Sequence, residues 1–175
     1  MYNITERIDE GWCEEYLGGY DTDYDVIKVE DNPQSVVANS GTMANWEALF
    51  AFSEAPAIES NYQEIERLLD IENFIDYMII NIYGGNTDWD HHNWYAIRKR
   101  GADSEGFHFL CWDTEQIFEG DNDNNLDENN YACPTWIFHN LLQNPDFVKR
   151  YLKRAAEVLA EDGALGEASV VSLWD

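Results

Sequence analysis

The chain has 175 residues, the size of a single domain that can bury one hydrophobic core. Hydrophobic residues make up 45% and aromatic residues 14% of the chain, which excludes intrinsic disorder, and no apolar run approaches the ~20 residues of a membrane span. The formal net charge of −25 disfavours general binding to nucleic acid and to anionic membranes, and attracts cations and basic proteins. Proteins from high-salt or marine sources carry similar charge, so the charge alone does not indicate a function.

Residue spacing in the first part of the chain predicts one strand and two helices. The alternating run 24–29 reads as a short strand, after a loop rich in Gly, Asp and Tyr over 11–23. A polar stretch follows, in which Thr42 can cap a helix that carries apolar residues at i, i+3 and i+4. A further helix is expected over about 62–69.

The clearest helix signal in the chain begins at Asp70, which can act as an N-cap. Six apolar residues between Ile71 and Ile82 recur at helical spacing and form a wide apolar face. Gly84-Gly85 should end this helix.

The second half of the chain predicts a hairpin followed by helices. Runs 94–99 and 107–112 read as its two strands, and 119–132 reads as a loop without periodicity. Pro134 and Pro145 can each open a helix, the second continuing to about residue 160. These elements predict a mainly helical α+β fold with one central β-hairpin.

Three cysteines, Cys13, Cys111 and Cys133, lie far apart, and no CxxC pair exists, so the sequence indicates neither a zinc knuckle nor a redox motif. Cys111 lies in an apolar predicted strand, which predicts a buried, unreactive thiol.

A dense polar stretch, 86–93, joins the predicted buried helix to the hairpin. Asp88 and Asn93 within it have the spacing D-x-x-x-x-N, and Asp113 and Glu115 lie just past the far end of the hairpin. A hairpin that returns to its start can bring such oxygen-bearing side chains around one point, and oxygen ligands suit magnesium. Protein kinases use this layout for phosphoryl transfer, with the first Asp at the attacking hydroxyl and the Asn and second Asp on the metal.

Three blocks of the sequence resemble the spore coat protein H (CotH) family of atypical kinases. They are YNITERID at 2–9, GGNTDWDHHN at 84–93 and CWDTE at 111–115, in the order that the family shows. The segments 141–147 and 163–165 also look like C-terminal helical blocks of that family. The resemblance covers roughly residues 1–166.

The resemblance implies a kinase-like C-lobe that transfers phosphate from ATP to Ser or Thr of a protein substrate. By it, Asp88 takes the catalytic role, and Asn93, Asp113 and Glu115 are the metal-binding candidates for Mg²⁺. A basic protein substrate is expected because the negative charge of the loop 119–132 would attract it, and a Ser-rich one because Ser supplies the acceptor hydroxyl. Many relatives are exported or surface-bound, so the resemblance favours a setting outside the cell or on its surface and leaves the compartment open.

The sequence contains no glycine-rich phosphate loop, and Gly18-Gly19 alone is not one. The resemblance therefore implies that the small lobe, with its ATP-contacting Lys, precedes Met1 in the parent chain and completes the nucleotide site. On this interpretation residues 1–166 are the C-lobe portion of a CotH kinase-like domain, and 167–175 are a C-terminal tail that frays.

Each candidate residue also has a simpler interpretation. Asp88, Asn93 and Asp113 can all serve as turn residues or pin the backbone at a strand end. His91-His92 suggests zinc, but adjacent histidines in a strand would point to opposite faces, so a structural role for one of them is favoured. The run 121–125 resembles a calcium loop, yet Leu126 stands where a Gly is expected, which excludes an EF-hand and leaves loose calcium binding by the loop 119–132 open.

Two further functions compete with the kinase. One is a non-catalytic surface or cell-wall module that keeps the fold without a working nucleotide site. The other is an adhesion domain stabilised by calcium at the acidic loops.

Overall fold

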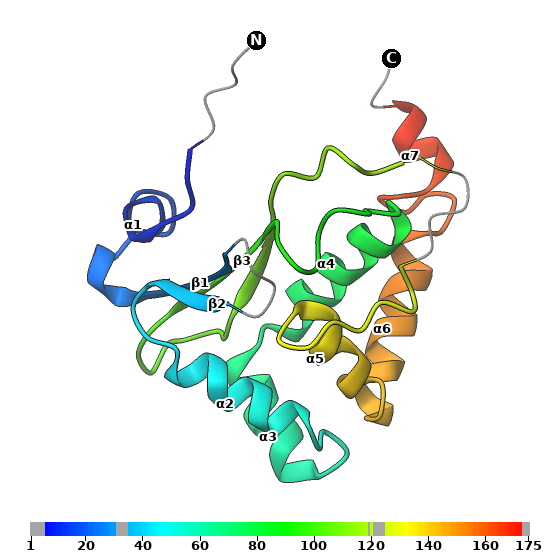
Figure 1. The fold of residues 1–175 in the computed structure, drawn as a ribbon. Coiled ribbons are helices and arrows are strands. Elements are labelled where there is room, and N and C mark those ends of the chain that lie inside the picture. The colour runs from blue at the N-terminus through cyan, green and yellow to red at the C-terminus, as the bar shows by residue number, and fades with distance from the viewer. Residues whose placement is uncertain (1–5, 31–34, 119, 121–124, 173–175) are drawn as a thin grey trace.

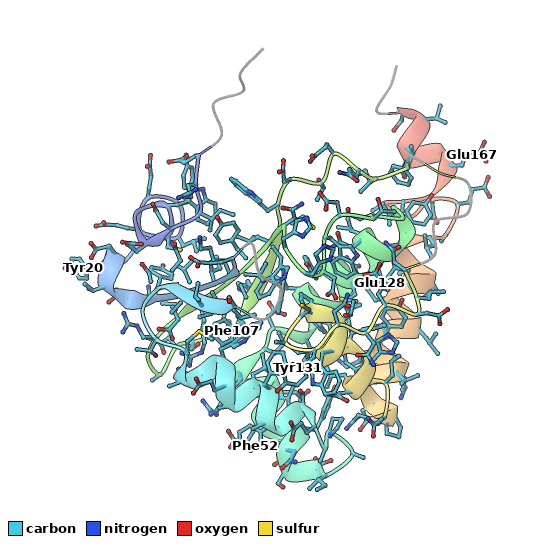
Figure 2. All side chains as sticks on the ribbon, in the orientation of Figure 1. Tyr20, Phe52, Phe107, Glu128, Tyr131 and Glu167 are labelled. Atoms are coloured by element: carbon cyan, nitrogen blue, oxygen red, sulfur yellow. The ribbon has the colours of Figure 1, made fainter. Side chains whose placement is uncertain are left out.

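The computed structural model describes residues 6–30, 35–118, 120 and 125–172. Within these residues the protein is an α+β fold in which seven α-helices and one 3₁₀ helix surround a four-stranded antiparallel sheet (Figure 1). Side chains fill the space between the sheet and the helices, where Phe107 lies (Figure 2). In chain order the elements are α1 (Glu10–Leu17), η1 (Asp21–Asp23), β1 (Tyr24–Val29), β2 (Val36–Ser40), α2 (Ala44–Ser53), α3 (Glu59–Leu68), α4 (Ile71–Tyr83), β3 (Trp94–Lys99), β4 (His108–Cys111), α5 (Pro134–Leu141), α6 (Pro145–Val158) and α7 (Glu167–Ser172).

The expectation of a single hairpin is wrong, because the sheet has four strands in the order β2-β1-β3-β4. The predicted hairpin exists as β3 and β4, with Trp94 opposite Cys111. The predicted strand 24–29 is β1, and it lies between β2 and β3, pairing with both. Strand β2 was missed because it is a half-buried edge strand whose sequence, VVANS, has neither a continuous apolar run nor clean alternation.

The sheet is covered on both faces. The larger core lies between the sheet and helices α2 to α6. A smaller core lies under α1 and includes Cys13, Tyr24 and Tyr95. Helix α1 occupies part of the segment 11–23, which was predicted to be a loop. The helix buries only Cys13, so apolar residues do not recur along it at helical spacing and the sequence did not predict it. Its N-cap is Asp9, whose carboxylate accepts a hydrogen bond from Trp12 N at 3.0 Å.

Helix α4 is confirmed as predicted, including its cap. Asp70 Oδ1 accepts a hydrogen bond from Asn73 N at 3.0 Å, and the helix buries seven residues. The Asn73 side chain also bonds to both backbone groups of Phe109, through Oδ1 to its N at 2.6 Å and through Nδ2 to its O at 3.2 Å. These bonds fix β4 against α4, and so fix the end of the hairpin relative to the loop that follows α4.

The remaining helices follow the sequence closely, with three differences. Helix α3 spans Glu59–Leu68, so it begins before the expected start at about residue 62. Helices α5 and α6 begin at Pro134 and Pro145 as predicted. Helix α2 begins at Ala44 without a side-chain cap; Thr42 N instead donates to Asp25 Oδ1 at 2.9 Å, which ties the loop before α2 to β1. Helix α7, Glu167–Ser172, lies in the segment that was expected to fray. None of the helices in the described ranges combines the length and apolar character needed to cross a bilayer.

The prediction of a buried Cys111 is wrong: Cys111 is exposed, whereas Cys13 and Cys133 are buried. Strand β4 is an edge strand and Cys111 is its last residue, so Cys111 is less covered than Phe109. Its Sγ still accepts a hydrogen bond from Asn81 Nδ2 of α4 at 3.6 Å.

We expect the exposed thiol of Cys111 to react with a thiol reagent near pH 8 faster than the two buried thiols, although partial desolvation raises the pKa of Cys111 as well. Burial raises the pKa of Cys13 to about 11 and that of Cys133 to about 12, so roughly 0.1% or less of either is the reactive thiolate. A colorimetric thiol assay should count one fast thiol, lost in Cys111→Ser, and three after unfolding in guanidinium chloride. Three fast thiols in the native protein would contradict the placement of Cys13 and Cys133.

Candidate active site

The candidate site is built on the loop between α4 and β3, which a chain of asparagine contacts fixes to the core. Asn81, buried in the last turns of α4, accepts a hydrogen bond at Oδ1 from Asn86 Nδ2 at 2.9 Å. Asn86 in turn accepts at Oδ1 from Asp88 N at 3.1 Å. Gly85, with φ 58°, makes the turn out of the helix. The backbone of Asp88 is therefore held by a buried network that starts in the core helix.

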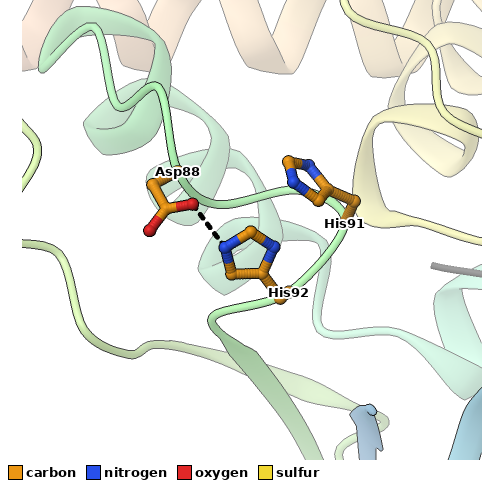
Figure 3. Close-up of side chains that lie close together, drawn as sticks. All are labelled: Asp88, His91 and His92. Atoms are coloured by element: carbon orange, nitrogen blue, oxygen red, sulfur yellow. Dashed lines mark hydrogen bonds and ion pairs between the residues drawn. The ribbon is translucent and has the colours of Figure 1, made fainter. Parts of the chain in front are cut away.

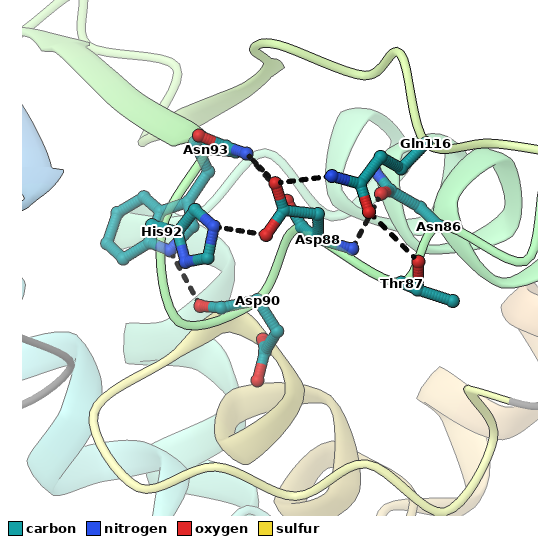
Figure 4. A network of polar contacts seen from close by, with 8 residues as sticks. Asn86, Thr87, Asp88, Asp90, His92, Asn93 and Gln116 are labelled. Atoms are coloured by element: carbon teal, nitrogen blue, oxygen red, sulfur yellow. Dashed lines mark hydrogen bonds and ion pairs between the residues drawn. The ribbon is translucent and has the colours of Figure 1, made fainter. Parts of the chain in front are cut away.

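Three neighbouring side chains orient the carboxylate of Asp88 (Figure 4). Asp88 Oδ1 is paired with His92 Nε2, and Oδ2 accepts from Asn93 Nδ2 at 3.2 Å and from Gln116 Nε2 at 3.3 Å. The side chain is 28% exposed, so the carboxylate is held in place while solvent still reaches it. A carboxylate in this state can accept a proton or a hydrogen bond from a hydroxyl that approaches from solvent.

Asn93 is the residue that joins Asp88 to the hairpin. Its Nδ2 also donates to the Asp88 backbone O at 2.7 Å, and its own backbone O accepts from Trp112 N at 3.3 Å. Its φ of 59° lies in the left-handed region, which Asn tolerates better than most residues. Because Nδ2 makes both side-chain bonds, Asn93 Oδ1 has no hydrogen-bond partner among the described residues and remains available to a ligand.

Asp113 lies directly after Trp112, at the same end of the hairpin as Asn93. It also has a positive φ, 52°, and its exposed carboxylate makes no hydrogen bond or ion pair with another described residue. Glu115 is likewise exposed. The structure thus brings Asp88 and Asn93 into direct contact, and it puts Asp113 next to the hydrogen bond that closes the hairpin, without direct contact between Asp113 or Glu115 and Asp88.

Asp90 is a buried anchor that the sequence interpretation overlooked. It is 0% exposed, and its carboxylate accepts from Thr135 N at 2.9 Å, Thr135 Oγ1 at 2.6 Å and Asn130 Nδ2 at 2.7 Å. Burial raises the pKa of Asp90, although the hydrogen bonds from Thr135 and Asn130 oppose that effect. Asp90 therefore ties the loop of Asp88 to the first turn of α5, where a carboxylate is also favoured by the helix dipole.

Replacing Asp90 by alanine is expected to lower the free energy of unfolding by about 3 kcal/mol. The change leaves the Thr135 N–H and two side-chain donors without an acceptor inside the protein, and hydrogen bonds to a charged group contribute about 1.5–3 kcal/mol each before the cost of burying that charge. Urea unfolding followed by tryptophan fluorescence measures the loss. The matched control is Asp103→Ala, at an exposed carboxylate, for which we expect a change within about 0.5 kcal/mol. Equal stability of the two variants would contradict the anchoring role.

The two histidines lie in a turn, not in a strand as expected, because β3 begins only at Trp94. Their rings therefore meet, with centroids 4.2 Å apart, and do not point to opposite faces. One ligand atom from each of Asp88, His91 and His92 lies within 4.8 Å of the others (Figure 3). The i, i+4 spacing of Asp88 and His92 was the one sequence signal for this contact. Asn86 lies inside the block 84–93 but was assigned no role, and Gln116 lies outside the blocks that resemble the family.

Within the loop 119–132, for which calcium binding was considered, residues 119 and 121–124 lie outside the described residues. The described Asn125 is 4% exposed, and its Nδ2 donates to the backbone O of Asn86. This residue therefore supports the loop of Asp88.

The chemistry of the donors fits a hard divalent cation. Asn93 Oδ1 is free among the described residues, and Asp113 and Glu115 carry exposed carboxylates, so all the candidate ligands offer oxygen.

The fold therefore presents an oriented carboxylate, an adjoining asparagine and a hairpin that returns beside them. Among protein-family models, the one described as CotH kinase protein matches residues 1–163. The chain therefore belongs to the CotH kinase family, as its sequence motifs predicted. Searches of curated proteins and of solved structures find no match.

Proposed function

We propose that this protein is an atypical protein kinase that transfers the γ-phosphoryl group of ATP to a Ser or Thr hydroxyl of a protein substrate, with Mg²⁺. Membership of the CotH kinase family supports kinase activity at the level of the family. The observation that carries the finer proposal is the Asp88–Asn93 pair, which is oriented by the loop after α4 and joined to the hairpin end that carries Asp113.

Asp88 acts on the substrate hydroxyl. Its carboxylate orients the hydroxyl and accepts its proton as the hydroxyl oxygen bonds to the γ-phosphorus and the bond from that phosphorus to the ADP oxygen breaks. His92, Asn93 and Gln116 hold the carboxylate in one orientation, which lowers the entropic cost of aligning it with the hydroxyl.

Asn93 and Asp113 are the residues that would hold Mg²⁺, with Glu115 assisting. Bound magnesium supplies positive charge that neutralises the phosphate oxygens during transfer. In these roles Asn93 offers Oδ1, since its Nδ2 is occupied by Asp88.

A basic or Ser-rich protein is the proposed substrate. The formal net charge of −25 attracts positively charged segments, and Ser residues supply the acceptor hydroxyl.

A phosphotransfer assay tests this function. The protein is purified as the polypeptide in which the chain naturally occurs, and it is incubated with γ-labelled ATP, Mg²⁺ and Ser-containing basic peptides of varied charge. We expect label in the basic peptides, less in acidic peptides with the same Ser content, and none when EDTA is present. A protein that binds neither ATP nor Mg²⁺ in calorimetry and transfers no label would support the non-catalytic surface module instead.

A further inference from the structure

Asp88, His91 and His92 form a second possible metal-binding group that differs in chemistry from the magnesium candidates. Figure 3 shows both imidazole rings turned toward Asp88, with the Asp88–His92 contact marked. Two imidazoles and one carboxylate are ligands that favour Zn²⁺ and related transition metals, whereas the all-oxygen set of Asn93 and Asp113 favours Mg²⁺.

The geometry is close to that of a three-residue zinc site. With zinc–ligand distances of about 2.0–2.2 Å, tetrahedral ligand atoms lie about 3.3–3.6 Å apart. The three ligand atoms here lie within 4.8 Å of one another, so small side-chain rotations bring them to that spacing. The direct Asp88–His92 contact shows that two of the ligand atoms already point at the same region, and metal binding would replace the bond between them.

The backbone that carries the three residues is held firmly. His92 N donates to Trp89 O at 2.7 Å, and the Trp89 side chain is 1% exposed. Asp90, which lies between Trp89 and His92 in the sequence, accepts a hydrogen bond from Thr135 N of α5. His91 itself makes a ring contact with His92, and neither of its ring nitrogens hydrogen-bonds to another described residue. Ligation by His91 therefore costs no hydrogen bond within the described part of the chain.

We propose that Asp88, His91 and His92 bind a transition-metal ion of the Zn²⁺ class and that this binding withdraws Asp88 from phosphoryl transfer. The second half of the proposal rests on the proposed kinase function, whereas the first half does not. The metal would take the same carboxylate that otherwise meets the substrate hydroxyl, so zinc and catalysis exclude each other. The strongly negative protein further raises the local concentration of divalent cations.

Metal binding is tested directly on the 175-residue chain, without ATP. Isothermal titration with ZnCl₂ is carried out in excess Mg²⁺, and Co²⁺ is added separately to record visible absorption. We expect the titration to show one Zn²⁺ bound per chain even in excess Mg²⁺. With Co²⁺ we expect visible absorption bands as intense as those of tetrahedral cobalt. His91→Ala should weaken binding at least tenfold and remove the bands. The matched control is His139→Ala on α5, which should change neither. The proposed site would be overturned if the wild type and His91→Ala bound Zn²⁺ equally well, or if His91→Ala and His139→Ala lost Zn²⁺ affinity to the same extent.

The consequence for activity is tested separately. His91 has no contact with the substrate hydroxyl in the proposed reaction, so His91→Ala should retain the Mg²⁺-dependent rate and require at least tenfold more Zn²⁺ for half inhibition. Equal inhibition of both proteins, or zinc binding without inhibition of the wild type, would overturn the proposed competition. If the wild type transfers no phosphate under any condition, the proposed function fails while the calorimetric result still decides whether the metal site exists.

Discussion

Asp88→Ala should reduce phosphotransfer at least ~10²-fold, because a positioned general base typically contributes about 10²–10⁴-fold to the rate. The loss should appear in kcat, with the KM for ATP little changed, since Asp88 meets the substrate hydroxyl and not the nucleotide in the proposed reaction. Initial rates of label incorporation at saturating ATP measure it. Asp88→Asn should lose a similar factor while keeping the side-chain size and an acceptor for His92, which separates the lost base from a disturbed loop.

The control for Asp88 is Asp103→Asn, which removes an exposed carboxylate in the β3–β4 turn and should leave the rate unchanged. Urea unfolding of each variant shows whether the fold is kept. Full activity of a folded Asp88→Ala protein would remove Asp88 from the mechanism.

Asp113→Asn should also lower phosphotransfer at least ~10²-fold, but for a different reason. It removes a charged oxygen ligand from the proposed magnesium site, and the metal supplies several kcal/mol of charge stabilisation in such reactions. The diagnostic result is a marked rise in the Mg²⁺ concentration needed for half-maximal rate, which Asp88→Asn should not show. Titrating Mg²⁺ at fixed ATP measures both.

Asp127→Asn is the matched control for Asp113, since Asp127 is another exposed carboxylate in the acidic segment after the hairpin. It should leave both the rate and the Mg²⁺ requirement unchanged. An Asp113→Asn protein with normal activity and a normal Mg²⁺ requirement would show that the exposed Asp113 is a turn residue only.

The sequence predicted those elements whose local chemistry and apolar spacing agree. Helix α4 has an Asp70 cap, a wide buried face and a Gly-Gly end, and all three appear in the structure. Helices α5 and α6 begin at their prolines because proline at the first helical position costs no hydrogen bond.

Elements whose stability comes from their partners could not be predicted in this way. Strand β2 is half-buried along its length and is defined by pairing with β1. Helix α1 covers the second face of the sheet with one buried residue, Cys13, so its amphipathic signal is weak. In both cases tertiary contacts determine a structure that the local sequence does not indicate.

The same distinction between local sequence signals and tertiary contacts applies to the residues of the candidate site. The spacing of Asp88 and Asn93 predicted their proximity, and their side chains do touch. Gln116 reaches Asp88 from 28 residues away, and Asp90 anchors the loop to Thr135 across 45 residues. Such long-range polar contacts leave no periodic trace in the sequence. The contact of His92 with Asp88 lies between these two cases. The i, i+4 spacing of the two residues can be read from the sequence, but the turn that brings their side chains together cannot.

The central claim is that Asn93 and Asp113 hold one divalent cation beside Asp88. A crystal structure with Mn²⁺ in place of Mg²⁺ and a non-hydrolysable ATP analogue tests it most directly, because anomalous scattering locates the manganese. We predict a manganese ion bound to Asn93 Oδ1 and to the Asp113 carboxylate, with a phosphate oxygen of the analogue in its coordination sphere. An analogue bound elsewhere, or manganese that occupies other carboxylates and leaves Asn93 and Asp113 without an ion, would contradict the account.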